Sequence, residues 1–393
     1  MNPQVLLIFD TRGHECAAML KGVAHYQRLH RPWSVTLDDA DAAGAKSALG
    51  WVRSKPWHGI ISRHTPPALV QACAQRKLPL VDLADTRPAA GLPKIRPDHP
   101  AIGRLGAEYF LKRKFRHFAF CGFSDQAWSG ERREGYRKTL AQAGFHSDVF
   151  DVKHPGDVSL DWDAKHIDAL ALWLGGLPDE VAVMACNDLR ALQVVRAAQA
   201  AGRQIPEEVA VLGANNDALR CELSNPPVSS VAVDAFQAGR QAAATLDRLM
   251  AGEKPESMDL RIAPVGVVTR KSTDVLALRD KDVAVAFHYI REHACKGITV
   301  DQVLEQVPVT RSWLENKFRR HIGRSPQAEI RRVQIDRICQ LLAETDLSLK
   351  DIAELTGFAY VEYLCVVFKR VTGETPGRYR QNVQAHEQVR ALA

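Results

Sequence analysis

Short apolar runs of strand length recur between residue 4 and about residue 250, and amphipathic stretches of helix length separate them. Strands that are apolar throughout and alternate with helices indicate parallel sheets covered on both faces. Because the units are too many for one sheet, we expect a domain of two α/β subdomains over residues 1–263. The apolar runs include VLLIF (5–9), GIIS (59–62), LPLVDL (78–83), FAFCGF (118–123), VAVMAC (181–186) and VAVLGA (209–214).

The alternation stops near residue 264, and the sequence from residue 282 onward has only helical periodicity. The stretch Val283–Cys295 is amphipathic, and Gln327–Leu342 spaces its apolar residues at helical intervals. We therefore expect a chain of the class α/β plus all-α. After the α/β domain we expect a linker at 264–281, a helical domain at 282–385 and a tail at 386–393.

The helical part contains a duplication. TVDQVLEQVPVTRSWLENKFRRHIGRSP (299–326) parallels SLKDIAELTGFAYVEYLCVVFKRVTGETP (348–376). Each copy predicts an N-cap, a short helix, a tight turn, a longer helix that ends at glycine, and a Ser/Thr-Pro pair that opens the next helix. One such pattern matches many ordinary helix pairs, and a basic helix alone is most often a solvated face. Two copies joined by one long helix favour a pair of helix-turn-helix units that read DNA.

The longer helix of each copy carries the residues expected to meet DNA. Leu314 and Phe318 anchor the first of these helices, and Leu364 and Phe368 anchor the second. Arg311 is expected to read guanine, because a guanidinium can donate to O6 and N7 together, and the basic residues after it suit phosphate contacts. The candidate DNA-binding residues are Arg311, Ser312, Asn316, Lys317, Arg319, Arg320, Tyr360, Glu362 and Lys369.

The stretch DIAELTGFAYVEYLCVVFKRVTGETPGRYR (351–380) resembles the signature of AraC-type regulators: IA, GF, an aromatic-plus-apolar pair, FK, G-x-TP and YR. The resemblance covers roughly 100 residues and implies that both recognition helices enter successive segments of the major groove. By position, it implies that Ser312, Asn316 and Glu362 contact bases. Glu362 and Val366 depart from the polar amides and basic residues often seen there.

Polar residues follow the carboxyl ends of several predicted strands, where open α/β sheets bind ligands. Carboxylates and amides pair with vicinal hydroxyls, an arginine donates hydrogen bonds, and an aromatic ring covers the apolar face of a sugar. Taken alone, a strand-end Asp or Asn is more often a helix N-cap than a ligand group, and Asp188 could be only the cap of its helix. The convergence of several such ends favours a sugar site. Its candidates are Asp10, Asp98, Trp128, Arg132, Asn187, Asp188 and Asn215.

This first part resembles the effector domains of lactose-repressor-type regulators. The markers are D-x-x-x-x-G-x-L (98–105), R-x-x-G-Y (132–136), ND (187–188) and VLGANN (211–216), where Asn215 stands in place of the usual ligand-binding Asp. The resemblance implies a two-lobed, periplasmic-binding-protein-like sensor whose lobes close on a sugar about a hinge.

Such a sensor followed by an AraC-type reader resembles the xylose operon regulator family, as do FHYIREHACKGITVDQVLEQ (287–306) and RKSTD (270–274). The resemblance implies D-xylose as the effector; another pentose or a hexose stays open. We expect a homodimer that binds operator DNA. An AraC-type reader favours activation, with RNA polymerase as a further partner, and repression stays open.

Other classes of protein fit the sequence poorly. The net charge of +6 only hints at a polyanionic partner, and the 8 cysteines form no C-x-x-C pair, which is typical of reduced thiols in the cytoplasm and not of a zinc site. AKS (45–47) lacks the glycines of a P-loop, and no catalytic motif is present, so we expect neither an enzyme nor a cofactor. A periplasmic transport protein would need a signal peptide, which MNPQVLLIFD does not provide, and no stretch is long enough to span a membrane.

Overall fold

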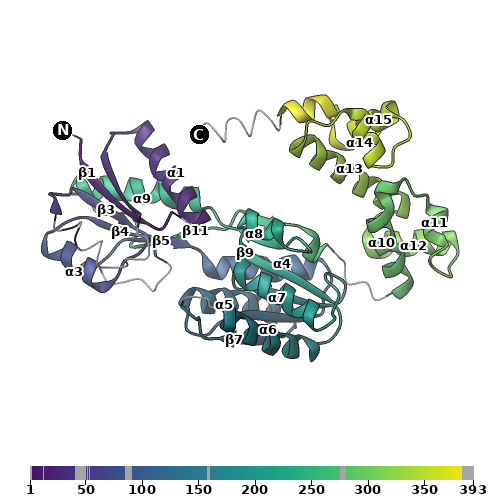
Figure 1. The fold of residues 1–393 in the computed structure, drawn as a ribbon, viewed down its shortest axis with the longest axis horizontal. Helices are drawn as coiled ribbons and strands as arrows, with labels where there is room; N and C mark the ends of the chain where they lie inside the picture. Colours follow the sequence, from purple (N-terminus) through teal and green to yellow (C-terminus); the bar gives the residue numbers. More distant parts are fainter. Residues whose placement is uncertain are drawn as a thin grey trace. The chain divides into compact units, whose positions relative to one another are not determined.

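Two compact units make up the chain, Met1–Val275 and Leu276–Ala393 (Figure 1). The first unit is α/β and the second is helical, which confirms the predicted fold class. The structure is a computed structural model that describes residues 2–11, 13–39, 50, 52, 54–84, 91–156, 160–274 and 280–382.

The first unit contains two sheets of six strands, in the orders β11-β5-β4-β3-β1-β2 and β12-β10-β9-β8-β6-β7. Neighbouring strands run parallel, as predicted, except that β12 pairs antiparallel with β10. We call the two halves built on these sheets the first and the second lobe. The strands are β1 (Gln4–Phe9), β2 (Ser34–Asp39), β3 (Gly59–Ser62), β4 (Leu80–Asp82), β5 (Lys94–Pro97), β6 (His117–Phe123), β7 (Asp148–Val152), β8 (Val181–Ala185), β9 (Val209–Asn215), β10 (Ser229–Ala232), β11 (Asp259–Ile262) and β12 (Gly266–Val268).

Helices cover both faces of the first sheet. Alternate residues of a strand point to opposite faces, so Val5 and Leu7 pack with α1 and α9, whereas Leu6 and Ile8 pack with α3. The helices of this unit are α1 (His14–Leu29), α3 (Pro67–Gln75), α4 (His99–Lys112), α5 (Ala127–Gln142), α6 (Leu160–Gly175), α7 (Asp188–Ala200), α8 (Ala218–Leu223) and α9 (Ala235–Met250).

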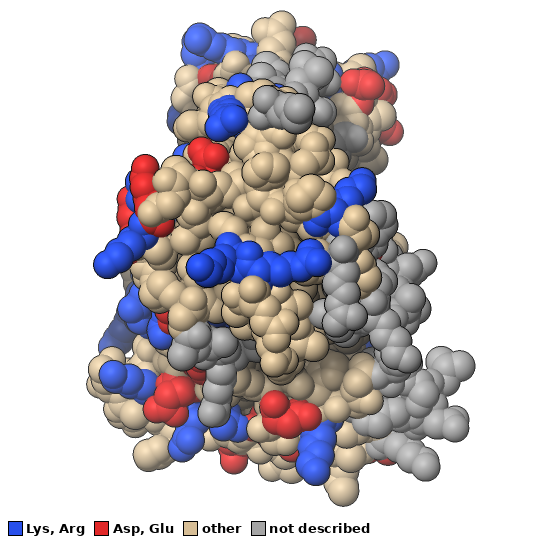
Figure 2. Space-filling view, turned by 90° about the vertical axis from the view of Figure 1, so that its left-hand side faces the viewer, with Lys and Arg blue, Asp and Glu red and all other residues tan. Residues whose placement is uncertain are grey.

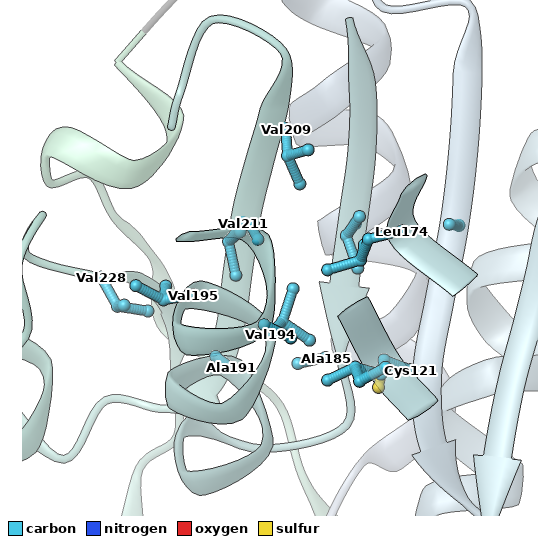
Figure 3. Packing of buried hydrophobic residues seen from close by; sticks show 14 of the residues in the cluster. Cys121, Leu174, Ala185, Ala191, Val194, Val195, Val209, Val211 and Val228 are labelled. Carbon is cyan, nitrogen blue, oxygen red and sulfur yellow. The ribbon is translucent and has the colours of Figure 1, made fainter. Parts of the chain in front are cut away.

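The second sheet is also packed on both faces. On one face Leu174 of α6 and Val194 of α7 join a buried cluster with Val211 of β9 (Figure 3). On the other face α4 and α5 cross at glycines. A Cβ on Gly103 would lie 1.9 Å from the carbonyl oxygen of Arg132, and one on Gly135 would lie 2.1 Å from that of Pro100. Only glycine permits this approach, which holds the start of α5 against the start of α4.

The chain crosses between the lobes of the first unit three times, from β5 to α4, from β10 to α9 and from β11 to β12. Each crossing is short, because only a few residues separate the flanking elements. Three short connections let two sheets move as bodies while the chain between them bends.

The predicted linker at 264–281 is wrong over residues 264–274, which belong to the second lobe. Strand β12 pairs with β10, and the short 3-10 helix η1 (Lys271–Thr273) is buried. There the Ser272 hydroxyl donates to the Val211 carbonyl oxygen at 2.6 Å. Residues 275–279 and the predicted tail at 386–393 lie outside the described residues.

The second unit follows the duplication. Thr299 and Ser348 each form a capping box at the start of a short helix, as their pairing predicts. Gly323 and Gly373 end the two longer helices with φ angles of 81° and 86°, a conformation that favours glycine. The helices are α10 (Lys281–His293), η2 (Ala294–Lys296), α11 (Val300–Leu304), α12 (Arg311–Ile322), α13 (Pro326–Glu344), α14 (Leu349–Leu355) and α15 (Val361–Thr372).

Buried contacts join the segment that follows α10 to the second copy. The side-chain nitrogen of Gln334, in the middle of α13, donates to the carbonyl oxygens of Ala294 at 3.1 Å and Thr356 at 2.9 Å. A Cβ on Gly357 would lie 2.2 Å from the backbone nitrogen of Gly297, so the two turns touch. These contacts join the segment at Ala294–Gly297 to α13 and to the turn after α14.

The surface carries charges of both signs. On the face drawn in Figure 2, basic and acidic side chains are interspersed among uncharged ones, and neither sign covers the face. Within the described residues, no helix is both long enough and apolar enough to cross a bilayer.

Candidate ligand site and candidate nucleic-acid interface

Arg132 of α5 brings three elements of the second lobe together. Its guanidinium donates to the Cys186 carbonyl oxygen after β8 at 2.5 Å and to Asn215 Oδ1 at the end of β9 at 2.8 Å. Its Nε donates to His99 Nδ1 at the start of α4 at 3.2 Å. The side chain is only 2% exposed and lies 5.3 Å from the centre of the Trp128 ring. A cation, an amide and an aromatic ring are thus fixed at the carboxyl ends of parallel strands.

The turn after β9 depends on its two asparagines. Asn215 and Asn216 have positive φ angles of 107° and 53°, which asparagine tolerates better than most residues. Asn216 is held from both sides, because its nitrogen donates to Ser230 Oγ at 3.0 Å and its Oδ1 accepts from Arg270 at 3.0 Å. The turn therefore presents Asn215 to Arg132.

Two predicted site residues are helix N-caps. Asp98 Oδ1 accepts from the nitrogen of Ala101 at 3.1 Å, and Asn187 Oδ1 accepts from that of Arg190 at 2.8 Å. Capping uses one polar atom of each side chain, so a ligand would meet the other.

Asp188 is buried, and both of its carboxylate oxygens are bound within the second lobe. Oδ1 accepts from the Ser230 hydroxyl at 2.5 Å, and Oδ2 accepts from the Asp217 nitrogen at 2.7 Å. Burial raises the pKa of Asp188 to about 6, although these hydrogen bonds oppose the shift. This arrangement favours a role in bracing the turn after β9 over direct contact with a ligand.

Asp10 lies in the first lobe, at the end of β1, and is half-buried. Its carbonyl oxygen accepts from the Gly13 nitrogen at 3.3 Å, at the start of α1. The structure therefore gathers Trp128, Arg132 and Asn215 in the second lobe and places Asp10 on the other one.

A cluster that the sequence analysis missed links the two lobes. Arg96 of β5 donates to both oxygens of Asp259 on β11, at 2.7 and 3.0 Å, within the first lobe. It also donates to both oxygens of Glu131 on α5, at 3.0 and 2.8 Å, in the second lobe. Hydrogen bonds to Asp259 raise the pKa of Arg96 despite its burial, so it stays charged. His99 was missed as well, and only its place beside Asp98 hinted at it.

The candidate DNA-binding side chains lie on the surface of the second unit. Leu314 and Phe318 are buried in α12, and Leu364 and Phe368 are buried in α15, as predicted. Arg311 is exposed and forms ion pairs with Asp301 at 3.1 Å and Glu315 at 3.7 Å, whereas Lys317 is half-buried beside Asp280 at 2.9 Å. The other exposed candidates are Ser312, Asn316, Arg319, Arg320, Tyr360, Glu362 and Lys369.

Part of the basic stretch serves the interior of this unit. Glu329 of α13 is fully buried and pairs with Arg324, with Arg332 at 2.8 Å and with Arg291 at 3.7 Å. Arg331 lies over the rings of Phe358 and Tyr363, with its guanidinium carbon 5.1 and 5.0 Å from their centres. Arg291, Arg324, Arg331 and Arg332 are therefore all engaged by other side chains of this unit.

Comparisons with known proteins agree with this architecture. Residues 107–273 match the family described as a periplasmic binding protein-like domain, and residues 304–382 match a helix-turn-helix domain. Over 387 residues the chain is 30% identical to the xylose operon regulatory protein of Escherichia coli strain K12, covering 96% of each chain. The protein of that name from Haemophilus influenzae is 27% identical, over 96% of this chain and 98% of its own.

A solved structure also resembles this chain over nearly its whole length. The structure of a xylose-binding transcription activator matches 97% of this chain and 98% of its own, with a TM-score of 0.72 and 29% identity. These relatives are transcription regulators and not enzymes. The chain therefore belongs to the family of xylose operon regulatory proteins, sugar-sensing transcription regulators in which a periplasmic-binding-like sensor precedes a DNA-binding helix-turn-helix domain.

Proposed function

We propose that this protein is a cytoplasmic, D-xylose-dependent activator of pentose-catabolism genes that acts as a homodimer on operator DNA. The observation that carries the sugar half of this proposal is the fixed Arg132 guanidinium, bound to Asn215 and to the Cys186 carbonyl oxygen. The relatives named for xylose support the choice of sugar.

The sugar would bind between the lobes of the sensor. Arg132 and Asn215 would hydrogen-bond its hydroxyls from the second lobe, together with the free atoms of the two caps, Asp98 and Asn187. Trp128 would cover its apolar face. Asp10 would meet the sugar from the first lobe, so binding would favour lobe closure about the three crossings.

The DNA half rests on the exposed faces of α12 and α15. Ser312 and Asn316 of α12 would contact bases beside Arg311, and Arg319 and Arg320 would bind phosphates. In α15, Tyr360 and Glu362 would face the groove, and Lys369 would bind a phosphate. Lys317, half-buried beside Asp280, would contribute least.

Sugar and DNA binding would be coupled through the dimer. Closure would change the placement of the two DNA-binding units and match them to two half-sites. A tenfold gain in operator affinity requires D-xylose to bind the DNA-competent state about 1.4 kcal/mol more tightly than the other state.

Mobility-shift titrations of the full chain at one salt concentration, with and without D-xylose, test this coupling. We expect tighter operator binding with the sugar, and an unchanged dissociation constant would refute the coupling. Calorimetry with D-xylose, L-arabinose, D-ribose and D-glucose tests the effector, and tighter binding of another sugar would replace D-xylose.

Two further measurements test the remaining parts. Sedimentation should give a dimer on DNA. Transcription in vitro with RNA polymerase should rise when protein and D-xylose are both present, whereas a fall would make the protein a repressor.

A further inference from the structure

Helices α12 and α15 can be compared position by position. Each has 12 residues and ends at a left-handed glycine. The buried anchors Leu314 and Phe318 correspond to Leu364 and Phe368, so each outward residue of one helix has a counterpart at the same position of the other. The duplicated fold therefore puts the residue two positions before each anchor in an equivalent place in the two helices.

The outward faces of the two helices differ in chemistry. Ser312 and Asn316 of α12 are polar and exposed, and their counterparts in α15 are Glu362 and Val366. Val366 is 54% exposed although it is branched and apolar. At the position where one helix offers an amide, the other offers two methyl groups.

An exposed valine can recognise only one feature of a base edge in the major groove. It neither donates nor accepts hydrogen bonds, and the thymine C5-methyl group is the apolar feature that the groove displays. Glu362 lies one turn before Val366 on the same face. Its carboxylate is repelled by phosphates and can accept a hydrogen bond from the N4 amino group of cytosine.

We propose that the two helices read DNA by different chemistry: α12 by hydrogen bonds, and α15 by packing Val366 against a thymine methyl group. This assignment rests on the proposed DNA-binding function and names the base chemistry that the second helix selects.

The charges near Val366 favour DNA over a protein partner as its occupant. Lys369 and Arg370 are exposed in the last turn of α15, one turn beyond Val366. A small apolar surface followed by two cations suits a base edge flanked by phosphates. In α12 two exposed cations, Arg319 and Arg320, likewise lie one turn beyond Asn316, the counterpart of Val366.

Replacement of single thymines by deoxyuridine tests the proposal, because it removes only the C5-methyl group. The full chain, with D-xylose, would first select its site from random duplexes, and each thymine of that site would then be replaced in turn. At one position, we expect affinity to fall about three- to fourfold, the factor for one methyl group removed from water.

Variants then show which helix reads that methyl group. Val366→Ser should bind thymine and deoxyuridine equally at that position, whereas the matched variant Asn316→Ser in α12 should keep the wild-type difference. Val366→Asn gives α15 the amide that α12 has at Asn316. This variant should prefer adenine, and no longer thymine, at that position.

Three outcomes would overturn the proposal. The first is a selected site at which no deoxyuridine replacement weakens binding, and the second is a Val366→Ser variant that keeps the full thymine preference. The third is a Val366→Ser variant that binds the site normally but no longer stimulates RNA polymerase, because the valine would then contact protein. If no site is selected, the proposed DNA-binding function itself is wrong.

Discussion

Arg132 is held by three elements of the second lobe, so its guanidinium would need no rearrangement to bind the proposed sugar. We predict that Arg132→Ala weakens D-xylose binding at least about 100-fold, because two lost charged hydrogen bonds cost roughly 3 kcal/mol or more. Operator binding without sugar should stay unchanged. Calorimetry and mobility shifts measure the two effects.

Arg104→Ala is the matched control, because this arginine lies on α4 and is largely exposed. It should bind the sugar like the wild type. Wild-type affinity in Arg132→Ala would remove Arg132 from the site.

The raised pKa of Asp188 predicts how the stability of the sensor depends on pH. Its pKa is raised to about 6 from an ordinary value of 3.8, so the folded state holds the proton more tightly than the unfolded state does. The stability gained from protonation is complete below about pH 4 and is lost as the pH rises through about 6.

We therefore predict that the wild type loses stability relative to Asp188→Asn between about pH 4 and pH 6, by up to about 3 kcal/mol. Urea unfolding of both proteins across this range measures the difference. Parallel stability curves would show that Asp188 titrates normally.

At the scale of elements, the crossing of α4 and α5 decides where Arg132 lies. A Cβ on Gly103 would lie 1.9 Å from the Arg132 carbonyl oxygen, so the helices would have to separate. We predict that Gly103→Ala destabilises the sensor by roughly 1–3 kcal/mol and weakens sugar binding. Thermal unfolding and calorimetry measure the two effects.

Gly175→Ala, at the end of α6, is the matched control, because a Cβ there meets nothing within 4 Å. It should leave both the stability and the sugar affinity near those of the wild type. If Gly103→Ala behaves in the same way, the close crossing does not position the site.

The sequence predicted those elements whose burial is continuous. Strands β1, β3, β6, β8 and β9 are apolar runs, and the caps and glycines of α11 to α15 have local signals. Edge strands lack a continuous apolar run, and Val35 and Leu37 of β2 stay partly exposed. Strand β12 has only three residues and cannot be told from a loop by its sequence, so the predicted linker began too early. Arg132 was found through its motif, but its partner at Cys186 is a backbone carbonyl, which no residue type marks.

At the scale of the whole sensor, the Arg96 guanidinium joins residues that the sequence separates widely and ties the two lobes together. Its bonds to Asp259 stay within the first lobe, whereas its bonds to Glu131 cross to the second. An attraction across the lobes stabilises their approach, so it should contribute to the closure that we propose for sugar binding.

We predict that Glu131→Gln, which keeps the shape of the side chain and removes its charge, weakens D-xylose binding about three- to tenfold. That range corresponds to roughly 1 kcal/mol, as expected for a partly exposed ion pair. Asp259→Asn removes a charge from the same guanidinium within one lobe, so it should lower the melting temperature and leave sugar affinity within about twofold of the wild type. Calorimetry separates the two cases: if both variants bind the sugar equally well, the ion pair between the lobes stabilises the fold without favouring closure.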